Sequence, residues 1–279
     1  MRPCYRLLAL DMDGTLLDRG GEVHPTTARA VRAAVAAGKH VVLASGRAPR
    51  HMVDVHRQLE LDTPIVAFNG ALVYDAGRQE VIHHEPIDLD VVRRIAQMLK
   101  EHDPTINLHV ETQEGLVDRW SVEAVDERLL DSIMRWKVEP PHSVGEIQQL
   151  LADEATRVSK LWFYAPVDTM AAIKCSMTTE FADRIATLAF DDVTLTILSS
   201  GVSKAAAVAW VAERYGVSRA EVMAIGDDLN DVPMLGWAGL GIAMGNAKPA
   251  ARAVAREITG ANTEHGVAQA IYRWALAPT

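Results

Sequence analysis

Aspartates in two short stretches of the sequence have the types and spacing of a metal site. Asp11 and Asp13 follow one apolar run, and Asp227 and Asp231 follow another, at residues 222–225. If these runs are neighbouring strands, four carboxylates converge, and like charges so close together are costly in a partly buried place. A hard cation removes that cost. Oxygen ligands without Cys or His favour Mg²⁺ over Zn²⁺, and Mg²⁺ is typical of a phosphate substrate.

Each of these aspartates alone has a simpler explanation. Asp is a favoured N-cap of helices and is common in solvated loops, so a single one would indicate no site. The combination is different, because all four follow predicted strand ends and two of them are flanked by glycine. The set therefore favours a shared site over four independent structural roles.

The elements that must position these residues alternate between strand and helix. Apolar runs predict strands, and the spacing of apolar residues between turn signals predicts helices. In chain order we expect a strand at 5–10, a helix at 26–37, a strand at 40–44, a helix at 48–59 and a strand at 65–68. The same pattern returns with a strand at 193–198, a helix at 204–215, strands at 222–225 and 240–243, and a helix at 266–276. This alternation predicts a doubly wound parallel sheet, whose working site lies at the carboxyl ends of its strands.

A different pattern interrupts this sheet. A hairpin is expected from strands at 71–74 and 81–84, followed by helices at 89–101 and 144–152 and strands at 107–111 and 158–164. The fold class is therefore α/β, a Rossmann-like doubly wound core with an inserted α+β domain. We expect residues 1–86 and 192–279 to form the core and residues 87–191 to form the insertion.

Composition excludes several classes of function. The 279 residues are 49% hydrophobic and 23% charged, a globular balance, and the formal net charge of −9 argues against a nucleic-acid partner. No run approaches the ~20 apolar residues of a membrane span. Only Cys4 and Cys175 are present, and we interpret them as small core residues in a cytoplasmic, reducing environment. Nothing indicates an oligomeric state.

Four motifs in the same order resemble those of the haloacid dehalogenase-like superfamily. Residues 11–17 (DMDGTLL) resemble its first motif and residues 45–47 (SGR) its second. Lys204 stands where the lysine of the third motif belongs, and residues 226–231 (GDDLND) are similar to the fourth. Further matches at 69–71 and 241–247, with the insertion between the second and third motifs, resemble the Cof-type branch, subfamily IIB. The glycine that often follows the lysine is replaced by Ala205, which leaves the substrate contacts of this loop open.

The resemblance implies phosphoryl transfer with an aspartyl-phosphate intermediate. Asp11 would attack phosphorus, and Asp13 would act as general acid and then general base. Mg²⁺ would be held by Asp11, the backbone carbonyl of Asp13 and Asp227, with Asp231 in or near the shell. Lys204 would place a positive charge beside the phosphate and Asp11.

The remaining assignments concern contacts with the substrate. By the same resemblance, Ser45 and Asn230 would donate hydrogen bonds to phosphate oxygens. Gly14 and Gly46 would let backbone N–H groups approach the anion. Arg47 and Asn69 are further candidate substrate-binding residues, although Arg47 fits a structural ion pair equally well and Asn69 begins a common turn dipeptide.

These observations predict a phosphatase acting on a small phosphorylated metabolite, such as a sugar phosphate. A sugar-phosphate mutase or phosphotransferase shares the aspartyl-phosphate step and differs only in whether water or a second hydroxyl accepts the phosphoryl group. A non-catalytic binding protein on the same scaffold is the third alternative. It is disfavoured because Asp11, Asp13 and Lys204 are all present.

Overall fold

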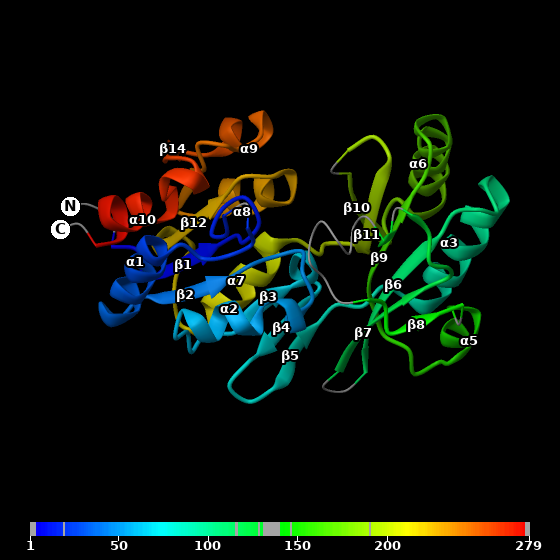
Figure 1. The fold of residues 1–279 in the computed structure, drawn as a ribbon, viewed down its shortest axis with the longest axis horizontal. Helices are drawn as coiled ribbons and strands as arrows, with labels where there is room; N and C mark the ends of the chain where they lie inside the picture. Colours follow the sequence, from blue (N-terminus) through cyan, green and yellow to red (C-terminus); the bar gives the residue numbers. More distant parts are fainter. Residues whose placement is uncertain are drawn as a thin grey trace. The chain divides into compact units, whose positions relative to one another are not determined.

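The chain forms two compact units, which are described separately. The structure is a computed structural model that describes residues 4–18, 20–114, 117–127, 129–130, 140–145, 147–189 and 191–276. One unit comprises Met1–His83 and Ser203–Thr279, and the other comprises His84–Val202 (Figure 1). Among the described residues, no helix combines the length and the apolar character that crossing a membrane requires.

The first unit is built on a five-stranded parallel sheet with the order β14-β13-β12-β1-β2. Its central strand, Val222–Gly226, is a completely buried apolar run, as expected where both faces of a parallel sheet are covered. The strands are β1 (Leu7–Leu10), β2 (His40–Leu43), β12 (Val222–Gly226), β13 (Leu240–Ala243) and β14 (Glu257–Ile258). The predicted doubly wound parallel sheet is therefore confirmed.

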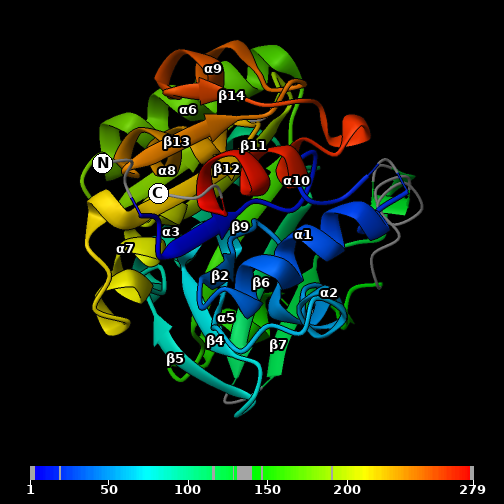
Figure 2. The same cartoon turned by 90° about the vertical axis from the view of Figure 1, so that its left-hand side faces the viewer.

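Helices cover both faces of this sheet. On one side lie α1 (Pro25–Ala36) and α10 (Gly266–Ala270), which continues into a π-helical turn (Ile271–Ala275), and on the other lie α7 (Lys204–Arg214) and α8 (Val232–Trp237) (Figure 2). Proline at the first turn of α1 and a serine N-cap on α7 explain where these two helices begin. The remaining helices of the unit are α2 (Val53–Gln58), after a 3₁₀ turn (Pro49–His51), and α9 (Pro249–Val254).

A smaller three-stranded sheet, β3-β4-β5, leaves the edge of the parallel sheet. It consists of β3 (Ile65–Ala67), β4 (Leu72–Asp75) and β5 (Glu80–His84), and the 3₁₀ turn Phe68–Gly70 joins the first two. A single parallel bridge between Ala44 and Val66 links β3 to the end of β2. The predicted hairpin is present, and β3 pairs mainly with that hairpin instead of extending the large sheet.

The second unit has a six-stranded sheet with the order β10-β11-β9-β6-β7-β8. The strands are β6 (Leu108–Glu114), β7 (Val117–Val122), β8 (Ser143–Val144), β9 (Val158–Tyr164), β10 (Ile185–Leu188) and β11 (Thr194–Ser199). Three helices, α3 (Leu89–His102), α5 (Ile147–Ala152) and α6 (Val167–Phe181), pack their apolar sides on one face of this sheet (Figure 1).

Two details differ from the sequence-based expectations. Strand β11 was expected to start the return of the first unit, but it pairs with β9 and β10 in the second, so the structural boundary follows Val202. An alternating strand carries no signal for which of two sheets it joins. Cys4 and Cys175 are exposed and unpaired, so their interpretation as core residues was wrong.

Candidate active site

The predicted site residues come together at the carboxyl edge of the parallel sheet. Strand β1 lies between β12 and β2, and its last residue, Leu10, is in register with Ile225 on one side and Leu43 on the other. The chain therefore leaves three neighbouring strands at one level. Chain order reverses at β1, which is the position where open α/β sheets bind their ligands.

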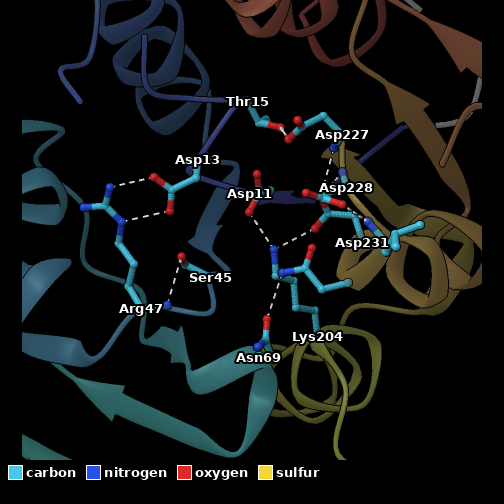
Figure 3. A network of polar contacts seen from close by, with 12 residues as sticks. Asp11, Asp13, Thr15, Ser45, Arg47, Asn69, Lys204, Asp227, Asp228 and Asp231 are labelled. Carbon is cyan, nitrogen blue, oxygen red and sulfur yellow. Dashed lines mark hydrogen bonds and ion pairs between the residues drawn. The ribbon is translucent and has the colours of Figure 1, made fainter. Parts of the chain in front are cut away.

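A fully buried lysine joins two of the aspartates. Lys204 is the first residue of α7, and its Nζ donates to Asp11 Oδ1 at 2.5 Å and to Asp231 Oδ1 at 2.7 Å (Figure 3). All three side chains are at least 95% buried. A buried cation is tolerated only when it is paired, so these carboxylates and the lysine fix one another in place.

Both carboxylate oxygens of Asp231 accept hydrogen bonds in this arrangement. Its second oxygen, Oδ2, accepts hydrogen bonds from the backbone N–H groups of Asp227 at 2.9 Å and Asp228 at 3.0 Å. The carboxylate lies so close to Gly226 that a side chain at that position would collide with it. The glycine at the end of β12 is therefore needed for Asp231 to reach Lys204.

Asp227 faces the first motif. Its Oδ1 accepts from Thr15 Oγ1 at 2.9 Å, and its Oδ2 lies against Gly14, where any side chain would overlap it. Gly14 also has a φ of +79°, which a residue with a Cβ adopts rarely. Glycine is thus required there for two independent reasons, the backbone conformation and the close approach of Asp227.

The electrostatics of the cluster are unfavourable for its carboxylates. Burial raises the pKa of Asp11 well above its usual range, with the charge of Asp231 adding to the effect and Lys204 opposing it. Burial raises the pKa of Asp227 to about 6 against the hydrogen bond from Thr15. Burial disfavours a charge on Lys204, but Asp11 and Asp231 outweigh it and raise the pKa of the lysine. One lysine thus faces three carboxylates.

These residues fit a divalent cation. One oxygen from each of Asp11, Asp227 and Asp231 lies within 4.8 Å of the others. Among the described residues, Asp11 Oδ2 is buried without a hydrogen-bond partner, an arrangement that costs free energy unless something else binds it. A cation would bind that oxygen and balance the excess negative charge. A donor set made of carboxylates suits Mg²⁺.

Asp13 points away from this cluster. Its carboxylate accepts from Arg47 Nε at 2.8 Å and from an Arg47 terminal nitrogen at 2.6 Å, so the two side chains form a bidentate ion pair (Figure 3). The Asp13 side chain is 41% exposed and that of Arg47 is 22% exposed. Of the two interpretations that the sequence left open for Arg47, the structure shows the ion pair.

Two polar residues follow the neighbouring strands. Ser45, after β2, is buried, and its Oγ accepts from the backbone N–H of Arg47 at 3.2 Å, which leaves the hydroxyl able to donate. Asn230 Nδ2 donates to Asn69 Oδ1 at 2.8 Å, so these two candidate substrate-binding residues contact each other. Asn69 also lies against Gly46, close enough that a side chain there would press on its amide.

A family model for haloacid dehalogenase-like hydrolases matches residues 8–271, a span that contains every residue of this site. The chain belongs to this family. The membership predicted from the four motifs is therefore confirmed, and with it the enzyme class, a hydrolase.

Other haloacid dehalogenase-like hydrolases match over nearly the whole chain. A 5-amino-6-(5-phospho-D-ribitylamino)uracil phosphatase of Bacillus subtilis is 31% identical and covers 94% of this chain and 95% of its own. A pyridoxal phosphate phosphatase of Escherichia coli is 30% identical, over 96% and 97%. A solved haloacid dehalogenase-like hydrolase from Bacillus subtilis superposes with a TM-score of 0.84 at 25% identity, covering 96% and 99%.

Sequence reasoning missed two residues of this hydrolase's site. Thr15, inside the first motif, donates to Asp227, and Asn246 donates through Nδ2 to the Gly14 carbonyl at 2.8 Å and to Asp227 Oδ2 at 3.4 Å. Both side chains donate hydrogen bonds to the Asp227 carboxylate and thereby fix its orientation. The only available signal was that each lies in a matched segment, because their contacts join residues that are 212, 232 and 19 positions apart in the sequence.

Proposed function

We propose that this enzyme is a Mg²⁺-dependent phosphatase that hydrolyses small phosphorylated metabolites, sugar phosphates among them, through an aspartyl-phosphate on Asp11. The observation that carries the proposal is the Asp11 carboxylate. Lys204 holds one of its oxygens, and the other is buried with no partner among the described residues. A carboxylate that is fixed through one oxygen and has lone pairs available on the other is suited to nucleophilic attack. The phosphatases among the matched relatives support the substrate class.

The metal would be held by Asp11, the backbone carbonyl of Asp13 and Asp227. Asp231 stands beside this set, and its hydrogen bonds to Lys204 and to two backbone N–H groups support it as the residue that orients the site. When bound, Mg²⁺ would neutralise negative charge on the phosphate and on the attacking carboxylate. Thr15 and Asn246 would keep the Asp227 carboxylate turned toward that position.

In the first step an Asp11 oxygen forms a bond to phosphorus as the bond from phosphorus to the leaving oxygen breaks. Asp13 donates a proton to that leaving oxygen, so that an alcohol departs. Arg47, which donates to both oxygens of Asp13, would hold the Asp13 side chain in position for this transfer. Lys204 keeps Asp11 in place throughout.

In the second step water attacks the phosphorus of the aspartyl-phosphate. Asp13, now ionised, accepts a proton from this water, and the Asp11 carboxylate leaves with both of its oxygens restored. Orthophosphate is the second product. The same residue thus serves as acid and then as base, which requires it to reach both the leaving group and the water.

The phosphate oxygens would be bound by Ser45, Asn230 and Lys204, with backbone N–H groups at Gly14 and Gly46. The buried Ser45 hydroxyl retains its proton for donation, and Asn230 Nδ2 carries a second hydrogen besides the one given to Asn69. Compact donors of this kind match the charge spread over the equatorial oxygens in phosphoryl transfer.

The second unit is proposed to select the leaving group. The residues assigned above all act on the phosphate and leave the rest of the substrate unrecognised, so specificity requires other parts of the chain. The predicted insertion, residues 87–191, is the candidate for this role, and the compact unit His84–Val202 contains it. A cytoplasmic location is proposed as well, and the unpaired, exposed Cys4 and Cys175 are its support.

A screen of phosphorylated metabolites with purified enzyme tests the proposal. We expect orthophosphate release that requires Mg²⁺, stops with a chelator and is lost in Asp11→Asn, a nearly isosteric change that removes the nucleophile. Recovery of the organic product as the free alcohol, in an amount equal to the phosphate, identifies a hydrolase. Transfer to a second hydroxyl would instead identify a phosphotransferase. Undiminished activity in Asp11→Asn would contradict the mechanism.

A further inference from the structure

The turn between β3 and β4 has an unusual backbone. Phe68, Asn69 and Gly70 all have positive φ values, of 49°, 58° and 103°. Glycine adopts this region readily and asparagine does so more often than most residues, but for the bulky Phe68 it is disfavoured. A conformation of this kind persists only where surrounding contacts impose it, and it is concentrated at functional sites.

The surroundings of this turn supply such contacts. The N–H of Phe68 donates to the Arg47 carbonyl and that of Asn69 to the Ser45 carbonyl, both at 2.9 Å. The Phe68 side chain is completely buried. The turn is thereby attached through its backbone to the loop that follows β2, which carries three of the candidate site residues, Ser45, Gly46 and Arg47.

The same turn also touches the helix that carries the lysine. A side chain at Gly70 would collide with the carbonyl of Ser203, the residue that caps α7 just before Lys204. Only a glycine permits this approach. The turn therefore contacts the loop of Ser45 on one side and the start of α7 on the other.

The side chain of Asn69 reaches a third loop. Its Oδ1 accepts a hydrogen bond from Asn230 Nδ2 at 2.8 Å, across 161 residues of sequence, and its amide lies against Gly46. Asn69 is only 3% exposed. Asn230 Oδ1 is buried with no partner among the described residues. The hydrogen bond to Asn69 is therefore the contact that determines the orientation of the Asn230 amide nitrogen and oxygen.

We propose that Asn69 is a positioning residue that acts through Asn230 and does not itself bind the substrate. By accepting from Nδ2 it orients the Asn230 amide with nitrogen toward the phosphate position and oxygen away from it. Without that acceptor the amide can rotate, and its oxygen would then face an anion. This inference rests on the proposed function, because it assigns Asn230 to the phosphate. It changes the expected role of Asn69 from substrate contact to support.

The left-handed backbone at Asn69 provides a variant that separates function from folding. Asn69→Gly relieves the backbone strain but removes the buried hydrogen bond to Asn230. Because these two effects oppose each other, its melting temperature should stay close to that of the wild type. Gln79→Gly is the matched control, because Gln79 is exposed at the tip of the β4–β5 hairpin with a φ of 56°. Gln79→Gly should relieve the same kind of backbone strain without any loss of activity.

A double-mutant cycle on kcat/KM, with p-nitrophenyl phosphate and with orthophosphate as competitive inhibitor, tests the proposal. Asn69→Gly and Asn230→Ala should each lower kcat/KM by about 10- to 100-fold and weaken orthophosphate inhibition, as expected for lost hydrogen bonds to a charged group. If Asn69 acts through Asn230, the double variant should be no worse than Asn230→Ala.

Three outcomes would overturn the inference. Losses that multiply in the double variant would show that Asn69 contacts the substrate independently. A lowered melting temperature in Asn69→Gly, with kcat/KM unchanged at a temperature where the variant is folded, would show a purely structural role. A wild-type enzyme without activity on any phosphate ester would remove the proposed function and this inference with it, whereas the first two outcomes leave the proposed function intact.

Discussion

At the scale of single residues, the site is organised by one buried lysine. Lys204 is completely buried, and it is tolerated there because it donates to both Asp11 and Asp231. In the described part of the chain, no lysine or arginine pairs with the third carboxylate, Asp227. It instead accepts a hydrogen bond from Thr15, and burial raises its pKa to about 6. The charge balance of the residues themselves therefore calls for a cation beside Asp11 and Asp227.

The pair of Arg47 and Asp13 leads to a prediction about leaving groups. Arg47 holds the carboxylate that must protonate the departing oxygen, so Arg47→Ala should leave Asp13 poorly oriented. We expect kcat/KM for an alkyl phosphate, whose leaving group needs a proton, to fall by about tenfold or more. For p-nitrophenyl phosphate, whose phenolate leaves unprotonated, it should change little. Steady-state kinetics on the two substrates give the comparison.

Arg47→Lys is the informative companion variant. Lysine keeps the charge but cannot form the bidentate contact, so it should show the same dependence on leaving group in a milder form. Equal losses on both substrates would indicate that Arg47 binds the phosphate itself, which would contradict its assignment to Asp13.

At the scale of elements, the sequence was most informative where chemistry and secondary structure coincide. The buried runs of β1 and β12 each end at an aspartate of the cluster, so the strand prediction also predicted the site. The direction in which a side chain points could not be predicted from the sequence. Nothing in the sequence indicates that Asp13 turns toward Arg47, or that Phe68 adopts a left-handed conformation, because both depend on contacts with distant segments.

Elements of the second unit were predicted less completely. Helix α6 and strands β7, β8 and β10 were not anticipated. Strand β9 has the predicted ends, and the ends of β6 and α3 lie within three residues of the prediction. Sheet residues on the face away from the helices include His109 and Trp162, whose rings stack at 3.6 Å. The missed strand β7 has two adjacent charged residues, Asp118 and Arg119, which interrupt the alternation that marks a strand.

The buried His109 leads to a prediction about pH and stability. Burial lowers its pKa to about 3 in the folded protein, while the unfolded chain should have the ordinary value of about 6.5. The unfolded state therefore binds a proton first as the pH falls. Stability is unaffected above pH 6.5 and decreases below it, by about 2 kcal/mol at pH 5. Urea unfolding at pH 7 and pH 5 measures the difference.

A substitution at this position isolates the effect. His109→Phe keeps an aromatic ring against Trp162 but cannot titrate, so its unfolding free energy should decrease less between pH 7 and pH 5 than that of the wild type. His102→Gln is the control, because His102 is exposed on α3. The same pH dependence in wild type and His109→Phe would show that His109 is not the group responsible.

At the scale of the whole molecule, the catalytic unit is assembled from both ends of the chain. Strand β1 pairs with β12, and Lys204 reaches Asp11 across 193 positions, while the unit His84–Val202 is inserted between them. Each motif could be identified from a short stretch of sequence. The residue at which the chain re-enters the first unit could not be identified in this way. The boundary differs from the expectation because β11 completes the inserted sheet.

The central claim is that Asp11 carries the phosphoryl group. Mass spectrometry of the Mg²⁺-loaded enzyme, quenched with acid during turnover, tests it most directly. A phosphoryl adduct should appear on the peptide that contains Asp11, accumulate further in Asp13→Asn, where water is no longer activated, and be absent from Asp11→Asn. Turnover without any adduct on Asp11, or with the adduct on another residue, would contradict the account.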